Sequence, residues 1–290
     1  MFSSLEILTV FVSFFEQIMP LKRFQFIDSF FQINSKKFEE NAALEKVFPL
    51  LQLFENFNKI YVPSNKICLN EIIAPFVGRF KYLVYNPLKP DKWGIKVYGT
   101  ADAITGYCLS LIPYLGQDTY KFFNIKDLNG LVLDVMQKFG SPGASIYIDN
   151  YYCNFNIAGI LLSNGFNVTG TFRQNRRDVP QIIKDASVKE IRKSTAKRVV
   201  QQGNKKKNSS PTQEKKVAKN VRYFENDQGI YAIKWKSKRI VTLLTTNHSL
   251  QSEVRDSARD RPVNRPIVVH EYNQYMRGID RLNQRTHYIK

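Results

Sequence analysis

The chain has 290 residues, of which 43% are hydrophobic, including 21 Phe and 15 Tyr. A chain of this length and composition can bury a large core without disulfides or metals, so an intrinsically disordered protein is excluded. Its 43 Lys and Arg outnumber 25 Asp and Glu, which leaves a formal net charge of +18. Such an excess favours a polyanionic partner: nucleic acid is the first candidate, with an anionic membrane surface and plain solubility as alternatives.

Residues 1–60 are predicted to be a helical N-terminal region. The first apolar run, 5–15, contains Glu6, is followed by Glu16 and has no preceding basic residue. We therefore interpret it as a buried amphipathic helix instead of a signal peptide or a membrane span. Apolar residues recur at spacings of three and four in two further stretches, 24–31 and 44–54.

Residues 61–172 are predicted to form an α/β layer. Short runs of β-branched and aromatic residues alternate with two helical patterns. The expected strands are 66–76, 93–102, 106–116, 144–149 and 167–172, and the expected helices are 125–139 and 154–164. A hairpin turn is expected between the second and third strands. This order of elements indicates an α/β fold.

Residues 173–265 are predicted to be a basic insertion with antiparallel strands. Sixteen Lys or Arg lie in 173–222 against four acidic residues. We expect DNA-phosphate contacts from Arg173, Arg176, Arg177, Lys205, Lys206, Lys207, Lys215 and Lys216. The basic clusters are equally consistent with nuclear-localisation patches or solvated loop charge. Antiparallel strands are expected in 223–247, followed by an arginine-rich polar loop, and 266–290 is assigned to a final core helix over about 268–284.

Cysteine and histidine are scarce. Cys68, Cys108 and Cys153 form no C-x-x-C pair, and the chain has three His. This pattern argues against a disulfide framework and against a zinc site, and it fits a reducing compartment.

Asp149 ends the buried strand 144–149. Phosphodiester chemistry by two metal ions needs about three converging carboxylates, and Mg²⁺ prefers hard oxygen ligands. A carboxylate at the end of a strand opens onto the crevice at the edge of a sheet. An Asp in this place is alternatively a turn former or the cap of the next helix, and the residue by itself leaves both interpretations open.

Four segments, 87–116, 148–180, 230–247 and 272–284, resemble piggyBac-type transposases in their order and spacing. The resemblance covers roughly 23–290, so the chain is similar to a member of that family truncated at both ends. It implies a ribonuclease-H-like core, a mixed sheet with flanking helices, and an inserted domain. It also implies a DDE/DDD-type site in which three aspartates hold two Mg²⁺ ions for cut-and-paste DNA transposition at TTAA sequences.

The resemblance assigns the candidate site residue by residue. Asp149 matches the second catalytic aspartate and Asp280 the third. The first aspartate falls at Asn70, so a neutral amide replaces a carboxylate, and Glu71 beside it is a candidate substitute. A further acidic position after the third is Asn283. We expect the metal ligands to be Asp149 and Asp280.

The sequence therefore predicts a nuclear, transposable-element-derived DNA-binding protein with a degraded strand-transfer site. Mg²⁺ or Mn²⁺ is its expected cofactor if it is active, and otherwise it needs none. DNA is the expected partner and a homodimer stays open, whereas no membrane and no small-molecule substrate are expected. The alternatives are an active two-metal transposase and a non-enzymatic chromatin or DNA-binding adaptor.

Overall fold

The computed structural model describes residues 19–20, 22–23, 26, 48–76, 78–87, 89, 91–186, 221–236, 238–247, 253–256 and 263–287. The chain divides into two compact units, Met1–Phe57 and Asn58–Lys290. Helix α3 (Phe48–Asn58) corresponds to the last predicted N-terminal helix, and nearly all of 1–47 lies outside the described residues. Within the described part of the chain, no helix has the length and apolarity that a membrane crossing requires.

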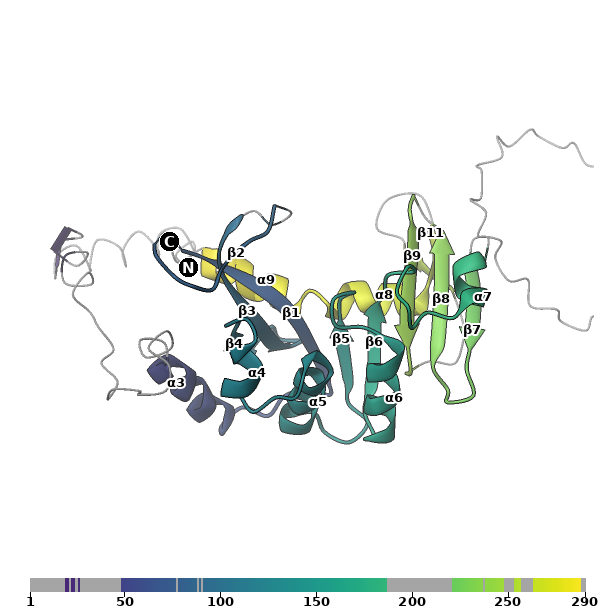
Figure 1. Ribbon diagram of the computed structural model, residues 1–290, viewed down its shortest axis with the longest axis horizontal. Helices are drawn as coiled ribbons and strands as arrows, with labels where there is room; N and C mark the ends of the chain where they lie inside the picture. Colours follow the sequence, from purple (N-terminus) through teal and green to yellow (C-terminus); the bar gives the residue numbers. More distant parts are fainter. Residues whose placement is uncertain are drawn as a thin grey trace, which may run out of the picture. The chain divides into compact units, whose positions relative to one another are not determined.

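A mixed β-sheet is the centre of the second unit (Figure 1). Its strands are β1 (Lys66–Pro75), β2 (Leu83–Tyr85), β3 (Trp93–Asp102), β4 (Cys108–Pro113), β5 (Ser145–Ile148), β6 (Asn167–Thr171), β7 (Val221–Glu225), β8 (Tyr231–Lys236) and β9 (Ile240–Thr245). Their order is β2-β3-β1-β5-β6-β9-β8-β7, and β4 also pairs with β3. The β1–β5 and β5–β6 pairs are parallel, whereas the other pairs are antiparallel.

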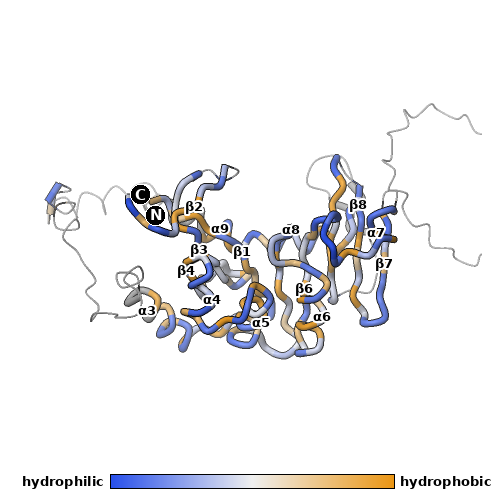
Figure 2. The backbone as a smooth tube through the Cα atoms, viewed as in Figure 1, coloured by the Kyte–Doolittle hydropathy of each residue, from blue (hydrophilic) through white to orange (hydrophobic). Residues whose placement is uncertain are grey.

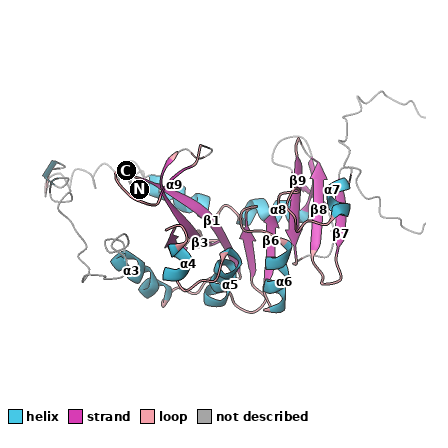
Figure 3. Ribbon diagram, in the orientation of Figure 1, coloured by secondary structure: helices cyan, strands magenta, loops and turns pink. Residues whose placement is uncertain are grey.

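Helices cover both faces of this sheet (Figure 3). They are α4 (Asp118–Phe122), α5 (Leu128–Phe139), α6 (Phe155–Ser163), α7 (Gln181–Asp185), α8 (Ile267–Tyr275) and α9 (Gly278–His287). Helices α5 and α6 share one core with the sheet, and α8 and α9 contribute to two others. The predicted fold class, an α/β fold with a mixed sheet and flanking helices, is confirmed.

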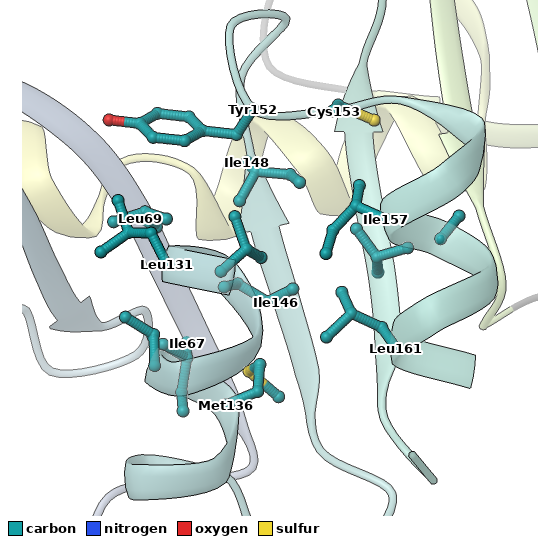
Figure 4. Close-up of a cluster of buried hydrophobic side chains, with 14 of the residues drawn as sticks. Ile67, Leu69, Leu131, Met136, Ile146, Ile148, Tyr152, Cys153, Ile157 and Leu161 are labelled. Carbon is teal, nitrogen blue, oxygen red and sulfur yellow. The ribbon is translucent and has the colours of Figure 1, made fainter. Parts of the chain in front are cut away.

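Alternation along the strands separates the cores on the two faces. In β1, Ile67 and Leu69 pack with α5 and α6, whereas Cys68 between them packs with α9. Ile146 and Ile148 of β5 lie on the α5/α6 face (Figure 4). Successive side chains of a strand point to opposite faces, so β1 and β5 are buried on both sides. In Figure 2 the central strands carry hydrophobic segments, and the connecting loops are mainly hydrophilic.

The strands of the predicted basic insertion extend the main sheet. β9 pairs antiparallel with β6, so β7, β8 and β9 continue the sheet at one edge. The basic stretch 187–220 lies outside the described residues. The predicted polar loop before the last helix contains a short hairpin, β10 (Glu253–Asp256) with β11 (Val263–Pro266). The sequence of these two strands is polar and lacks the apolar run that indicated the equally short β5.

Two helices stand where the sequence pattern predicts one final helix. α8 ends at Tyr275 and α9 begins at Gly278. Gly278 lies directly on the Sγ atom of Cys68 in β1, with no room for a Cβ atom between them. Glycine therefore permits the first turn of α9 to approach the sheet closely.

Candidate functional site

Asn70 of β1 and Asp149 directly after β5 lie where the parallel pairing of these two neighbouring strands ends. The register of the sheet pairs Leu69 of β1 with Ile148 of β5, and each candidate residue directly follows one of these two. The polar positions therefore come together at the carboxyl edge of the β1–β5 pair, where sheets of this kind open onto a crevice. Across β1, Asn70 pairs with Gly99 of β3. Gly99 lies under Ile279 of α9, which places Asn70 on the α9 face of the sheet.

The side-chain amide of Asn70 makes a hydrogen bond within the protein. Its Oδ1 atom accepts a hydrogen bond of 2.8 Å from the backbone N–H of Glu71. An amide oxygen carries no net charge, so it cannot bridge two divalent ions as a carboxylate does. The position that the resemblance assigns to the first aspartate is therefore occupied by a neutral side chain with an internal partner.

Asp149 is a carboxylate held in an environment that opposes its ionisation. Burial is the largest cause and raises the pKa of Asp149, and the nearby charge of Glu71 raises it further. Hydrogen bonds from the backbone N–H groups of Tyr151 and Tyr152, and the charge of Lys89, act in the opposite direction. The Tyr151 N–H lies 2.8 Å from Oδ1 of Asp149. The net effect is a pKa above the ordinary value.

Glu71, the candidate substitute ligand, is engaged on the opposite face of the sheet from Asn70. Its Oε2 atom lies 2.9 Å from Nζ of Lys96 in β3, and both side chains are largely buried. Lys96 also lies over the ring of Tyr151, 4.2 Å from the ring centroid. The backbone carbonyl of Glu71 accepts a hydrogen bond from Nζ of Lys89. Both lysines were missed by sequence reasoning, and strand alternation in 93–102 was the available signal for Lys96.

Tyr152 lies next to these carboxylates at the end of β5. Its hydroxyl points away from the aliphatic cluster that surrounds Ile148 (Figure 4). The oxygen is buried and has no hydrogen-bond partner among the described residues. Burial raises the pKa of Tyr152, and the charges of Asp149 and Glu71 raise it further. This edge of the sheet therefore combines carboxylates with a buried phenol, and the sequence carried no signal for it.

Asp280 lies in the first turn of α9 and is exposed, whereas its neighbour Ile279 is buried against the sheet. Tyr272 of α8 lies close enough to both Asp280 and Asp149 to respond to the charge of each. Burial raises the pKa of Tyr272, and the charges of Asp149 and Asp280 both add to the increase. The structure thus joins Asn70 and Asp149 on adjacent strands and places Asp280 on the helix above the same face, with its side chain toward solvent.

These side chains do not fit a pair of divalent ions. Among the residues that the structure describes, no group of three or more His, Cys, Asp and Glu is arranged to hold a metal ion. Asn70 supplies no charge, Glu71 is bound to Lys96, and the pKa of Asp149 is raised by burial. Two ions about 4 Å apart repel each other strongly unless about three carboxylates neutralise them.

The basic candidates divide into three groups. Arg176 donates hydrogen bonds from Nη1 to the carbonyl oxygens of Asn150 and Cys153, so it supports the loop that follows Asp149. Arg173 is exposed, and its Nε atom donates to Oδ1 of Asn150 at 2.9 Å. Arg177 is exposed beside them. The five remaining lysines, Lys205, Lys206, Lys207, Lys215 and Lys216, lie outside the described residues.

Comparisons with known proteins identify the family and the fold of the chain. The model of the family described as Transposase IS4 matches residues 8–290. Among solved structures, the chain is similar to the piggyBac transposase in a cryo-EM structure of its synaptic complex with hairpin DNA. The TM-score is 0.65 at 22% identity, over 90% of this chain and 49% of that one. The chain thus spans about half the length of that transposase.

Proposed function

We propose that this chain binds DNA through a site that is no longer competent for strand transfer. The premise is that the chain belongs to the Transposase IS4 family and is a piggyBac-type transposase. Its core is then ribonuclease-H-like, and the protein is derived from a transposable element. The observation that carries the proposal is Asn70, a neutral amide with an internal hydrogen bond, beside Asp149 where the pairing of β1 with β5 ends.

DNA as the partner is supported by charge and by position. The chain carries a formal net charge of +18. Exposed Arg173 and Arg177 lie in the segment that follows β6, and Arg173 contacts the loop after Asp149. Arginine at such a place contacts phosphate oxygens without reading sequence. A nuclear location and a homodimer are part of the same proposal.

Impaired catalysis follows from the charges at the site. Removal of one of three neutralising carboxylates leaves at least one metal position too electropositive to fill. The two ions stabilise the attacking and leaving oxygens together, so the loss of one ion reduces the rate by orders of magnitude. No step through a bound metal is assigned to this chain.

The test is Mg²⁺-dependent nicking and joining of DNA that carries transposon terminal repeats. We expect the unaltered chain to bind this DNA in a salt-dependent manner without nicking it above background. Asn70→Asp restores a carboxylate at the first position, and any recovery of nicking in that variant supports the assignment. Robust nicking by the unaltered chain would show that the site is intact.

An active transposase in which Glu71 replaces the missing ligand is the second candidate, and it receives less support. The carboxylate of Glu71 is paired with Lys96 on the face opposite Asn70. If Glu71 were the ligand, Glu71→Gln would abolish the nicking of the unaltered chain. The third candidate, a non-enzymatic chromatin adaptor, depends on 187–220 and predicts that deletion of 192–219 removes DNA affinity.

A further inference from the structure

The hairpin formed by β2 and β3 presents an aromatic pair to solvent. Tyr85 and Trp93 pair across the two strands, so their side chains share one face. Their ring centroids lie 4.8 Å apart with an interplanar angle of 42°. The side chains are 53% and 59% exposed. Large exposed aromatics placed side by side are costly in water and mark an interaction surface.

The segment that carries this pair is rich in basic residues. Residues 79–93 contain four basic side chains, Arg79, Lys81, Lys89 and Lys92, against one acidic residue, Asp91. Arg79, Lys81 and Lys92 are exposed. The partner of an aromatic surface in such a basic segment is expected to be anionic and to carry flat π-faces. Single-stranded DNA has both properties, since its bases stack on aromatic rings while its phosphates meet the lysines and arginine.

The aromatic pair lies on the same face of the sheet as Asn70. Side chains alternate along β3, so Trp93 and Gly99, six residues apart, point the same way. Gly99 pairs with Asn70 in the adjacent strand. Six residues of strand span roughly 20 Å at about 3.3 Å per residue. A strand of DNA that passes the Asn70–Asp149 edge can therefore reach the pair within a few nucleotides.

We propose that Tyr85 and Trp93, in a segment that also carries exposed Arg79, Lys81 and Lys92, form a platform that stacks unpaired DNA bases. The inference rests on the proposed DNA-binding function and deepens it by naming the form of DNA. Duplex DNA buries its bases in the helical stack and offers the platform only phosphates. The platform therefore distinguishes single-stranded from double-stranded DNA of the same length.

Binding of a fluorescent 12-nucleotide single strand and of the matching duplex to the full chain tests this proposal. We expect Trp93→Ala to weaken single-strand binding about tenfold, as the loss of a base–aromatic stack does, and to leave duplex binding within about twofold. Trp93→Phe keeps an aromatic ring and retains most of the affinity. Ile182→Ala removes an exposed apolar side chain of α7 and is the matched control.

Tryptophan fluorescence gives a second readout that a change in stability would not produce. The chain has two tryptophans, and Trp235 is buried. In a Trp235→Phe background, the single strand should quench the emission of Trp93, and the duplex should quench it far less. A second variant removes positive charge and keeps the aromatic pair. Lys81→Gln combined with Lys92→Gln should reduce the salt dependence of single-strand binding.

Three results would overturn the inference. If Trp93→Ala leaves single-strand affinity unchanged while duplex binding persists, the platform is wrong and the proposed function stands. If Trp93→Ala weakens both forms equally, the pair makes a general contact and does not stack on bases. If neither form of DNA binds the unaltered chain, the proposed function and the platform fail together.

Discussion

Two carboxylates of the same sheet, buried Asp102 and partly buried Asp149, have opposite surroundings. Asp102 ends β3 and Asp149 follows β5, and because β3 runs antiparallel to β1 while β5 runs parallel to it, they lie at opposite edges. Asp102 is fully buried and accepts five hydrogen bonds, from Tyr61, Ser64, Ile104 and Thr105. Burial favours its neutral form, but these bonds outweigh burial and lower the pKa of Asp102.

At Asp149 the balance is reversed. Burial dominates, the charge of Glu71 adds to it, and the pKa of Asp149 is raised. The ionised form of Asp102 therefore stabilises the folded protein, whereas ionisation of Asp149 destabilises it. A group that destabilises its own fold is a mark of a functional site, whereas the satisfied group is structural.

The largest effect is expected for Asp102→Ala. The variant removes the charged acceptor of three part-buried hydrogen bonds, from the backbone N–H groups of Ser64, Ile104 and Thr105, which are worth about 1.5–3 kcal/mol each. We expect the free energy of unfolding to fall by more than about 3 kcal/mol in urea denaturation at pH 7. Asp134→Ala, which removes an exposed carboxylate from α5, should change it by less than about 0.5 kcal/mol.

The lowered pKa of Asp102 also sets the sign of a pH effect. Its ionised form stabilises the folded state above the carboxyl pKa of about 4 of the unfolded chain, and this stability is lost as pH falls through the folded value. The difference between the unaltered chain and Asp102→Ala should therefore shrink below about pH 4. An equal difference at pH 7 and pH 3 would contradict the structural role of this group.

A smaller loss is expected for Gly278→Ala at the start of α9. The new Cβ atom collides with Sγ of Cys68 and approaches the backbone of Asp102 and Ala103. Overpacking of this kind costs about 1–3 kcal/mol. Cys68→Ala removes the colliding sulfur, so the double variant should recover part of the loss in a double-mutant cycle. Strict additivity of the two changes would show that α9 does not rest on β1 as described.

Much of this account was predictable from the sequence, and what was not has physical reasons. Runs of β-branched and aromatic residues located β1, β3 and β5, and apolar residues at helical spacing located α5, because these residues form the buried core. Asp149 followed from its place at the end of a strand, and Asn70 from the resemblance to piggyBac-type transposases. Lys96 was missed because a charged residue inside a strand gives no sign of the partner that it will meet in the next strand.

The role of Asp102 was also invisible in the sequence. It occupies a hairpin turn, where Asp is common for local reasons, and its bonds to Tyr61 and Ser64 depend on the fold. The split of the last helix at Gly278 has the same cause, since the close approach to Cys68 is a tertiary contact. Local pattern thus indicated where carboxylates lie, and the fold decided which one is satisfied.

The smallest effect is a gain in stability for Asp149→Asn. The raised pKa means that folding favours the protonated form, so the contribution is favourable below about pH 4 and is lost as pH rises through the folded value. A neutral amide avoids that loss and still accepts the Tyr151 N–H. We expect the free energy of unfolding of Asp149→Asn, measured by thermal denaturation, to exceed that of the unaltered chain by roughly 0.5–2 kcal/mol at pH 7 and to show no gain at pH 3. A loss of stability at pH 7 would make Asp149 structural, like Asp102.

Calorimetric titration of Mn²⁺ or Mg²⁺ into the full chain tests the central claim most directly. The claim is that the amide at position 70 prevents the Asp149 edge from holding two ions. We predict fewer than two tight sites in the unaltered chain, at least one additional site in Asn70→Asp, and none gained in Asn70→Ala. Two tight sites in the unaltered chain, unaffected by Asn70→Ala, would contradict it.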